Sequence, residues 1–198
     1  MSYPLHPNGT ATASTLNRSI VRDVAIIFAG SLLVGLSAHA KVFLPFTPVP
    51  VTAQTLTVLL LGATLGSRRG TGAVLLYLAW GASGLPVFAA ASAPFWMSPS
   101  GGYLIGFVAA AFVTGWLAEH GLDRGLKLVL ALAAGNAIIY AIGLPWLATF
   151  LAASAPDNLM RTTLAAGLVP FLPGDAVKLV AAALAAPSGR RLMKWQWR

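Results

Sequence analysis

The sequence predicts an all-α integral membrane protein built as a bundle of six transmembrane helices. Of the 198 residues, 57% are hydrophobic and only 9% are charged, whereas a soluble domain carries about 25% charged residues. So few charges could not cover the outside of a soluble bundle. The chain also contains long apolar segments, and helices are the economical way to satisfy backbone hydrogen bonds inside a bilayer.

Six hydrophobic segments are the candidate spans, since a helix needs about 20 residues to cross roughly 30 Å of hydrocarbon. The sixth segment contains Pro170 and Pro173, and proline disfavours helical geometry at the residue before it. We therefore predict a short outer piece that ends at Leu172 and a new helix that starts at Pro173. The second segment begins after the Pro-rich stretch 45–50 and ends near residue 66. The other five run over residues 24–39, 71–85, 101–119, 126–147 and 163–186.

The distribution of basic residues predicts the orientation of the bundle. Of the 13 Lys and Arg residues, ten lie in the tails and loops on one side. Only Lys41 and Arg161 lie in loops on the other side, and Lys178 is inside the last span. Cytoplasmic loops carry the excess of Lys and Arg. The bias predicts that both termini, Arg68 and Arg69 face the cytoplasm.

Several function classes are excluded by what the chain lacks. It has no cysteine, which excludes disulfides and cysteine-based metal sites. Its three histidines, at positions 6, 39 and 120, have no partner at the spacing of a catalytic triad or a metal motif. The glycine-containing stretch 66–70 lacks the ending of a phosphate-binding loop. The basic residues form no stripe with aromatics, which argues against nucleic acid. We predict no catalytic residue, no metal and no cofactor.

The strongest single feature is a pair of charges within the last span. Asp175 and Lys178 are three residues apart, so they share one face of a helix. Each charge at membrane depth costs about 2.5–3.5 kcal/mol on insertion scales and is by default a sign of function. In the alternative interpretation, Asp175 only caps the helix and Lys178 neutralises it.

The predicted topology brings further polar side chains to the outer half of the bundle. Any one of them could instead form a hydrogen bond between two helices or lie at the membrane interface. Together they predict a polar pocket that opens outward beneath the loops 45–50 and 86–100. Inside an apolar cavity a few such groups fix the orientation of a ligand, and Lys178 indicates a ligand with a carboxylate. The additional residues are Thr52, Gln54, Tyr77, Tyr103, Asn136 and Tyr140.

Small residues at a spacing of four mark the first span, as at Ala25 and Ala29. Such ridges allow helices to approach closely. They serve either a partner in the membrane or packing within the bundle, and the spacing alone leaves both interpretations open.

Five blocks of the sequence, taken in order, resemble the BioY family, which supplies the biotin-specific S components of energy-coupling factor (ECF) transporters. The first, Pro-Val-Pro-Val-Thr-Ala-Gln-Thr-Leu, is similar to the entry of the family's second helix. This chain departs from the family in its Ala-rich residues 89–93 and in its entry to the fourth span. The five blocks are residues 48–56, 77–88, 101–107, 135–140 and 170–178.

The resemblance implies a six-helix S-component fold that takes up biotin through an outward-facing pocket. The family's Asp-x-x-Lys element places Asp175 and Lys178 against the polar groups of biotin, with Asn136 assisting, and the second block adds Phe88. Ala25 and Ala29 match the ridge by which S components dock the transmembrane T component. The expected partners are that T component and two ATPase subunits, which alone use ATP, unless the chain works by itself.

We therefore expect a multi-pass protein of the bacterial cytoplasmic membrane. Its parts are a polar tail at 1–21, the substrate-binding domain at 22–187 and a basic tail at 188–198. The lipid bilayer is a partner, and a homo-oligomer is left open. The alternatives are an S component for another carboxylate-bearing vitamin, an intramembrane enzyme and a purely structural bundle.

Overall fold

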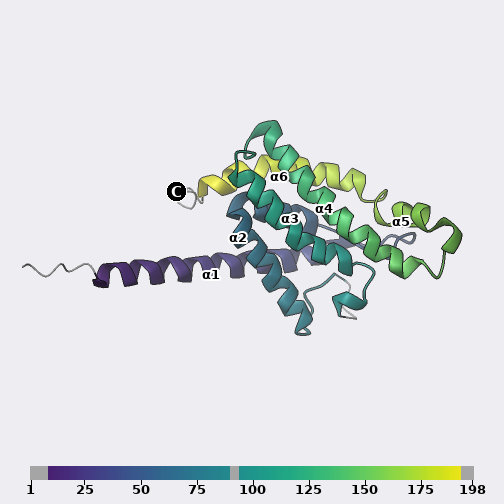
Figure 1. Ribbon diagram of the computed structural model, residues 1–198, viewed down its shortest axis with the longest axis horizontal. Helices are drawn as coiled ribbons and strands as arrows, with labels where there is room; N and C mark the ends of the chain where they lie inside the picture. The colour runs from purple at the N-terminus through teal and green to yellow at the C-terminus, as the bar shows by residue number, and fades with distance from the viewer. Residues whose placement is uncertain (1–8, 90–93, 193–198) are drawn as a thin grey trace, which may run out of the picture.

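The computed structural model describes residues 9–89 and 94–192. Its helices are arranged around one hydrophobic core (Figure 1), and the predicted all-α architecture is confirmed. Within these residues, two short strands, Lys41–Val42 (β1) and Val51–Thr52 (β2), pair antiparallel, and two 3-10 turns occur at Phe95–Met97 (η1) and Pro156–Asn158 (η2). The helices are α1 (Gly9–His39), α2 (Gln54–Ala82), α3 (Gly101–Glu119), α4 (Gly125–Leu151), α5 (Leu159–Gly167) and α6 (Leu172–Leu192).

Helix α2 is a hairpin of two arms that reverses at one residue. Gly66 has φ 84° and ψ 175°, a conformation that is open to glycine but strained for other residues. Gln54 and Tyr77 are 23 residues apart, yet their side chains are hydrogen-bonded at 2.8 Å. A straight helix would separate them by about 35 Å. The two arms correspond to the second and third predicted spans.

The reversal corrects one detail of the sequence analysis. We expected a cytoplasmic loop that contained Arg68 and Arg69, but both residues lie in the second arm and Gly66 alone makes the turn. The arms approach closely, because a Cβ atom added to Gly70 would lie 3.0 Å from the Cα atom of Gly62. Only small residues permit this contact.

Among the described residues, three helical segments are long and apolar enough to cross a membrane on their own, namely Ser19–His39 within α1, α3 and α4. Helices α5 and α6 together pass the same test as one span that is bent by 44°. The bend lies between Gly167 and Leu172, so the predicted break at the prolines is present and α6 begins one residue before Pro173. The two arms of α2 correspond to the other two predicted spans, but neither arm alone is long enough to cross the hydrocarbon.

The termini differ in extent from the predicted tails. Residues 9–21 of the N-terminal tail continue helix α1. The C-terminal tail is helical as far as Leu192, and the remaining residues 193–198 lie outside the described part of the chain.

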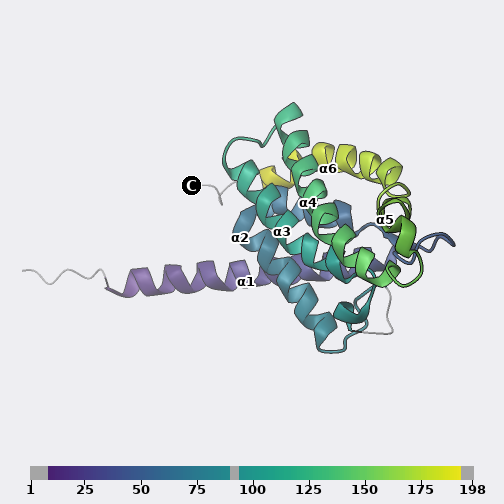
Figure 2. The same cartoon turned by 45° about the vertical axis from the view of Figure 1, so that its right-hand side comes forward.

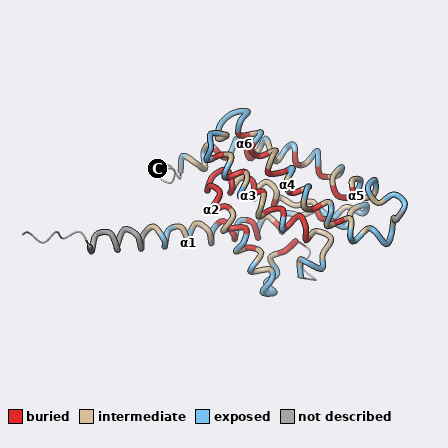
Figure 3. Tube along the Cα trace, in the orientation of Figure 1, coloured by how far each residue is buried: buried red, intermediate tan, exposed pale blue. Residues whose placement is uncertain are grey.

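The core of the bundle lies between α2, α3, α4 and α6. Helix α3 packs between the α2 hairpin and α4, α6 contacts both α2 and α4, and α1 contacts α2. Turning the molecule shows α1 outside the other helices (Figure 2). Buried residues follow α2 and α3, whereas α1 carries many exposed ones (Figure 3).

Charged side chains tie the helices together at the end of the bundle that contains Gly66. Glu119 at the end of α3 accepts hydrogen bonds from the amide and hydroxyl groups of Ser67, both at 2.8 Å. Arg190 of α6 donates to the carbonyl oxygen of Ala63 at 2.7 Å and forms an ion pair with Asp123 at 3.0 Å. Because Ala63 is near the C-terminal end of the first arm, the arginine also complements the dipole of that arm.

Candidate ligand-binding site

A pocket opens at the opposite end of the bundle, between α2, α3, α4 and α6. It encloses about 680 Å³ of space that protein atoms do not occupy, counting its open mouth. Ligand pockets of proteins are mostly apolar with a few polar groups, and this lining has the same character. The apolar part of the lining is aromatic and aliphatic, and it includes Phe88, Phe95, Leu104, Phe107, Ile139 and Phe171.

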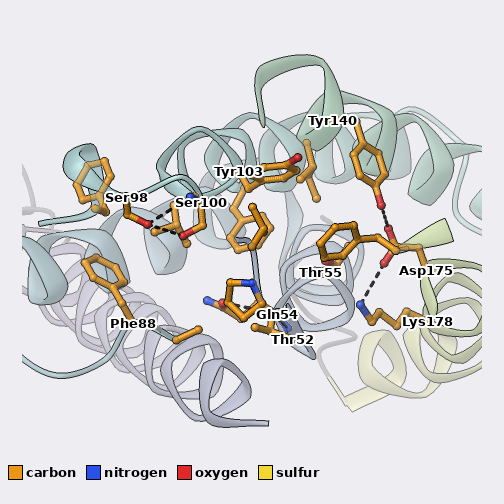
Figure 4. Close-up of a pocket in the computed structure, with 18 residues that line it drawn as sticks. Thr52, Gln54, Thr55, Phe88, Ser98, Ser100, Tyr103, Tyr140, Asp175 and Lys178 are labelled. Atoms are coloured by element: carbon orange, nitrogen blue, oxygen red, sulfur yellow. Dashed lines mark hydrogen bonds and ion pairs between the residues drawn. The ribbon is translucent and has the colours of Figure 1, made fainter. Parts of the chain in front are cut away.

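The carboxylate of Asp175 is the centre of the polar part of the pocket. The residue is 4% exposed. Its Oδ1 accepts from the Lys178 ammonium at 3.1 Å. Its Oδ2 accepts from Asn136 Nδ2 at 3.2 Å and from the Tyr140 hydroxyl at 2.5 Å. These contacts join α6 to α4, and Figure 4 shows Tyr140 and Lys178 on two sides of the carboxylate.

This geometry decides against Asp175 as a mere helix cap. Helix α6 begins three residues earlier, at Leu172, and the amide group of Asp175 donates to the carbonyl oxygen of Phe171 at 2.8 Å. The recorded partners of the carboxylate are side chains. Burial of a charge is tolerated where it is paired and hydrogen-bonded.

Lys178 retains hydrogen-bonding capacity for a ligand, whereas Asn136 does not reach the pocket surface. The side chain of Lys178 is 16% exposed and lines the pocket, and an ammonium group has three donors. One of them is directed to Asp175. Asn136 lies behind the pocket lining, and its Oδ1 atom is buried without a hydrogen-bond partner in the described structure.

A second polar group comes from the α2 hairpin. Gln54 is 2% exposed and lines the pocket. Its Nε2 donates to the hydroxyl of Tyr77, and its Oε1 accepts from Thr52 Oγ1 at 3.3 Å. Tyr77 itself is fully buried and is not part of the lining. It supports Gln54 from the second arm, so the reversal at Gly66 is a condition for this part of the site.

Tyr103 and Phe88 shape the wall and the roof. The Tyr103 hydroxyl donates to the carbonyl oxygen of Gly167 at 2.9 Å, which fixes the ring beside the joint of α5 and α6. Phe88 packs edge to face on Tyr77 and on Phe95. In the roof, the ammonium of Lys41 donates to the carbonyl oxygen of Ala89, which links β1 to the loop after α2.

All nine predicted ligand-binding residues thus lie at this pocket or directly behind it. Seven line it, while Asn136 and Tyr77 each bond to a residue that does. Sequence reasoning missed several lining residues, because an apolar side chain that faces a cavity looks the same as one that faces lipid. Of the missed polar residues, Ser98 and Ser100 are within the predicted roof, and Thr55 directly follows the predicted Gln54. Those missed are Val49, Pro50, Thr55, Ala89, Phe95, Ser98, Ser100, Leu104, Phe107, Ile139 and Phe171.

The predicted docking residues Ala25 and Ala29 are both exposed on α1. The buried face of the same helix is formed by other residues, among them Gly30, Ser31 and Val34. The two alanines are therefore on the outside of the described bundle.

Comparison with known proteins gives a consistent match. The BioY family model matches residues 9–195. The protein called Biotin transporter BioY of Rhizobium etli is 37% identical over 175 residues, which cover 82% of this chain and 90% of that protein. The protein of the same name from Thermotoga maritima is 40% identical over 162 residues, 81% of this chain and 89% of that protein.

A solved structure shares the fold. It is described as a crystal structure of the S-component for biotin from an ECF-type ABC transporter, and it matches with a TM-score of 0.73 at 23% identity. The match covers 90% of this chain and 94% of that chain.

Proposed function

The chain belongs to the BioY family, and on that premise we propose that it is the biotin-binding subunit of a vitamin uptake system. The observation that carries the proposal is the ion pair of the buried Asp175 with the half-buried Lys178, which is joined to α4 at the pocket. A structural bundle would not need these charges, which cost about 2.5–3.5 kcal/mol each. The relatives are named biotin transporters, and these names indicate biotin as the ligand.

The chemistry of the pocket suits the polar groups of biotin. Biotin has a carboxylate, ureido N–H donors and a ureido carbonyl. The Lys178 ammonium donates to either of the two acceptors, whereas an ionised Asp175 only accepts and therefore suits the N–H groups. Gln54 and Thr52 add an amide and a hydroxyl group on the α2 side. The aromatic lining covers the apolar part of the ligand.

We also propose that uptake involves a T component and two ATPase subunits. The chain has no phosphate-binding loop, so the hydrolysis of ATP falls to partner subunits. Ala25 and Ala29 present small side chains on the outside of α1, where a membrane-embedded partner could approach closely. If the chain transports alone, uptake will not require these subunits.

The proposed location is the bacterial cytoplasmic membrane, with both termini in the cytoplasm and the pocket open to the outside. The excess of basic residues at the opposite end of the bundle supports this orientation. The substrate-binding domain is residues 22–187, between the tails 1–21 and 188–198.

Binding of labelled biotin to the purified protein in detergent tests the function. We expect saturable binding that unlabelled biotin displaces. Vitamins without a carboxylate should not compete. Tighter binding of a different carboxylate-bearing vitamin would overturn the assignment of biotin while leaving the family membership intact.

A further inference from the structure

A second cavity lies on the outer surface of the bundle, between α4 and α5. It encloses about 980 Å³, counting its open side. Both views of the ribbon show α5 beside the C-terminal part of α4 (Figures 1 and 2). Apart from Tyr140 and Thr163, its lining is apolar. The apolar residues are Ala141, Leu144, Pro145, Ala148, Leu159, Met160 and Leu164. We call this cavity the α4–α5 groove.

Thr163 is an unusual member of this lining. It is 4% exposed, and its Oγ1 is a buried atom without a hydrogen-bond partner in the described structure. A buried hydroxyl that is left unsatisfied destabilises the folded state. Such a group in a folded protein calls for an explanation, one of which is a ligand. A groove lined by apolar residues and one free hydroxyl suits an amphiphile.

The depth of the groove indicates what that amphiphile is. Helix α4 is about 40 Å long at 1.5 Å per residue, so its midpoint is near Ile138 and Ala148 lies about 15 Å beyond it. The hydrocarbon of a bilayer ends at about that distance from the midplane. The groove therefore begins in the acyl region near Tyr140 and ends at the level of the glycerol esters.

Charge points to the same ligand. Arg161 is exposed on α5, one residue from Met160, which lines the groove. It takes part in none of the ion pairs recorded among the described residues. Asp157 is the nearest acidic residue along the chain and is exposed as well. A cation at the membrane surface attracts the phosphate of a lipid.

We propose that the α4–α5 groove is a binding site for one phospholipid molecule. One acyl chain lies along the groove against Leu144 and Leu164. A glycerol ester carbonyl accepts the hydrogen bond of Thr163, and Arg161 pairs with the phosphate. Tyr140 lines both this groove and the ligand pocket. The lipid chain therefore lies directly behind the phenol that donates to Asp175.

Native mass spectrometry of the full chain, titrated with dioleoyl phosphatidylglycerol, tests the proposal. Thr163→Val should lower the affinity of the most tightly bound lipid about three- to tenfold, which corresponds to the loss of one hydrogen bond. Thr162→Val, on the neighbouring residue outside the groove, should leave it unchanged. Ala148→Trp, which fills the groove, should abolish tight binding, whereas Ala185→Trp, at an exposed position of α6, should not. Arg161→Gln should reduce the preference for phosphatidylglycerol over oleic acid.

The two sets of variants make the proposal falsifiable even if one protein folds poorly. Equal lipid affinity in Thr163→Val and Thr162→Val would show that the hydroxyl does not meet a lipid. Equal affinity in both tryptophan variants would place the bound lipid elsewhere. If wild-type protein bound oleic acid as tightly as phosphatidylglycerol, the phosphate contact at Arg161 would be wrong.

Discussion

Replacement of Asp175 by asparagine is the most direct test of the site. The change keeps the shape of the side chain but turns one acceptor oxygen into an N–H donor. If the new amide nitrogen replaced Oδ1, it would face the Lys178 ammonium, which now lies at 3.1 Å. If it replaced Oδ2, it would face the donors of Asn136 and Tyr140. The first orientation opposes a donor to a donor, whereas in the second the Tyr140 hydroxyl can turn to accept; in both, Lys178 loses its counter-ion.

The size of the effect follows from the burial of the partners. Lys178 would keep its charge at 16% exposure without a counter-ion. Loss of one partner of a buried, hydrogen-bonded charge contact costs about 2–5 kcal/mol, which is roughly 30- to several-thousand-fold in affinity. We therefore expect Asp175→Asn to weaken biotin binding at least tenfold.

A filter assay with radiolabelled biotin measures the change, and size-exclusion chromatography shows whether the variant still purifies as a folded protein. Asp157→Asn is the matched control, because Asp157 is an exposed acid outside the pocket. If the Asp175 variant bound biotin within threefold of wild type, the polar centre of the pocket would not contact the ligand and our assignment would be refuted.

Four further outcomes are expected. Lys178→Met should also weaken biotin binding at least tenfold. The double variant with Asp175→Asn should unfold at a higher temperature than either single variant, since it leaves no unpaired charge in the bundle. An additive loss of thermal stability in the double variant would contradict this. Ala29→Trp should lower uptake and leave biotin affinity unchanged, whereas a parallel loss of both would assign the ridge to packing. Arg190→Met should destabilise the fold by about 1–3 kcal/mol, measured by thermal unfolding. Its side chain is 13% exposed and joins α6 to α2 and to the loop that contains Asp123. Arg191→Met, at an exposed position, should leave the stability unchanged. Reporters fused to the two termini should be active only in the cytoplasm, and a periplasmic signal from either would contradict the topology.

The polar part of the site could be predicted from the sequence because membranes penalise polar groups. Asp175, Lys178 and Asn136 stand out in apolar segments, and the alternation of spans places them at one level. The structure adds which atoms meet, notably that Tyr140 and Asn136 share one oxygen of Asp175. Apolar lining residues such as Phe107 and Ile139 carry no comparable signal, since lipid-facing and pocket-facing positions have the same composition.

The same limit explains the corrections. The sequence predicts a loop at Arg68 and Arg69 because charges normally lie between spans, yet both residues are in the second arm of α2, close to the turn at Gly66. Nothing in the sequence specifies a turn of one residue. Arg190 was counted with a basic tail, but its side chain lies between α2 and the loop that contains Asp123. Long-range contacts of this kind depend on packing that no local pattern reports.

The reversal at Gly66 also bears on how the chain enters the membrane during synthesis. At 1.5 Å per residue the two arms extend only about 18 Å and 24 Å, and neither alone would reach across roughly 30 Å of hydrocarbon. With no loop between them, one arm cannot partition into lipid while the other waits in the translocation channel. We expect the hairpin to integrate as one unit, with its tip and Arg68 held at the cytoplasmic surface. A bulky residue at position 66 would then interfere with biogenesis before it affected any finished pocket.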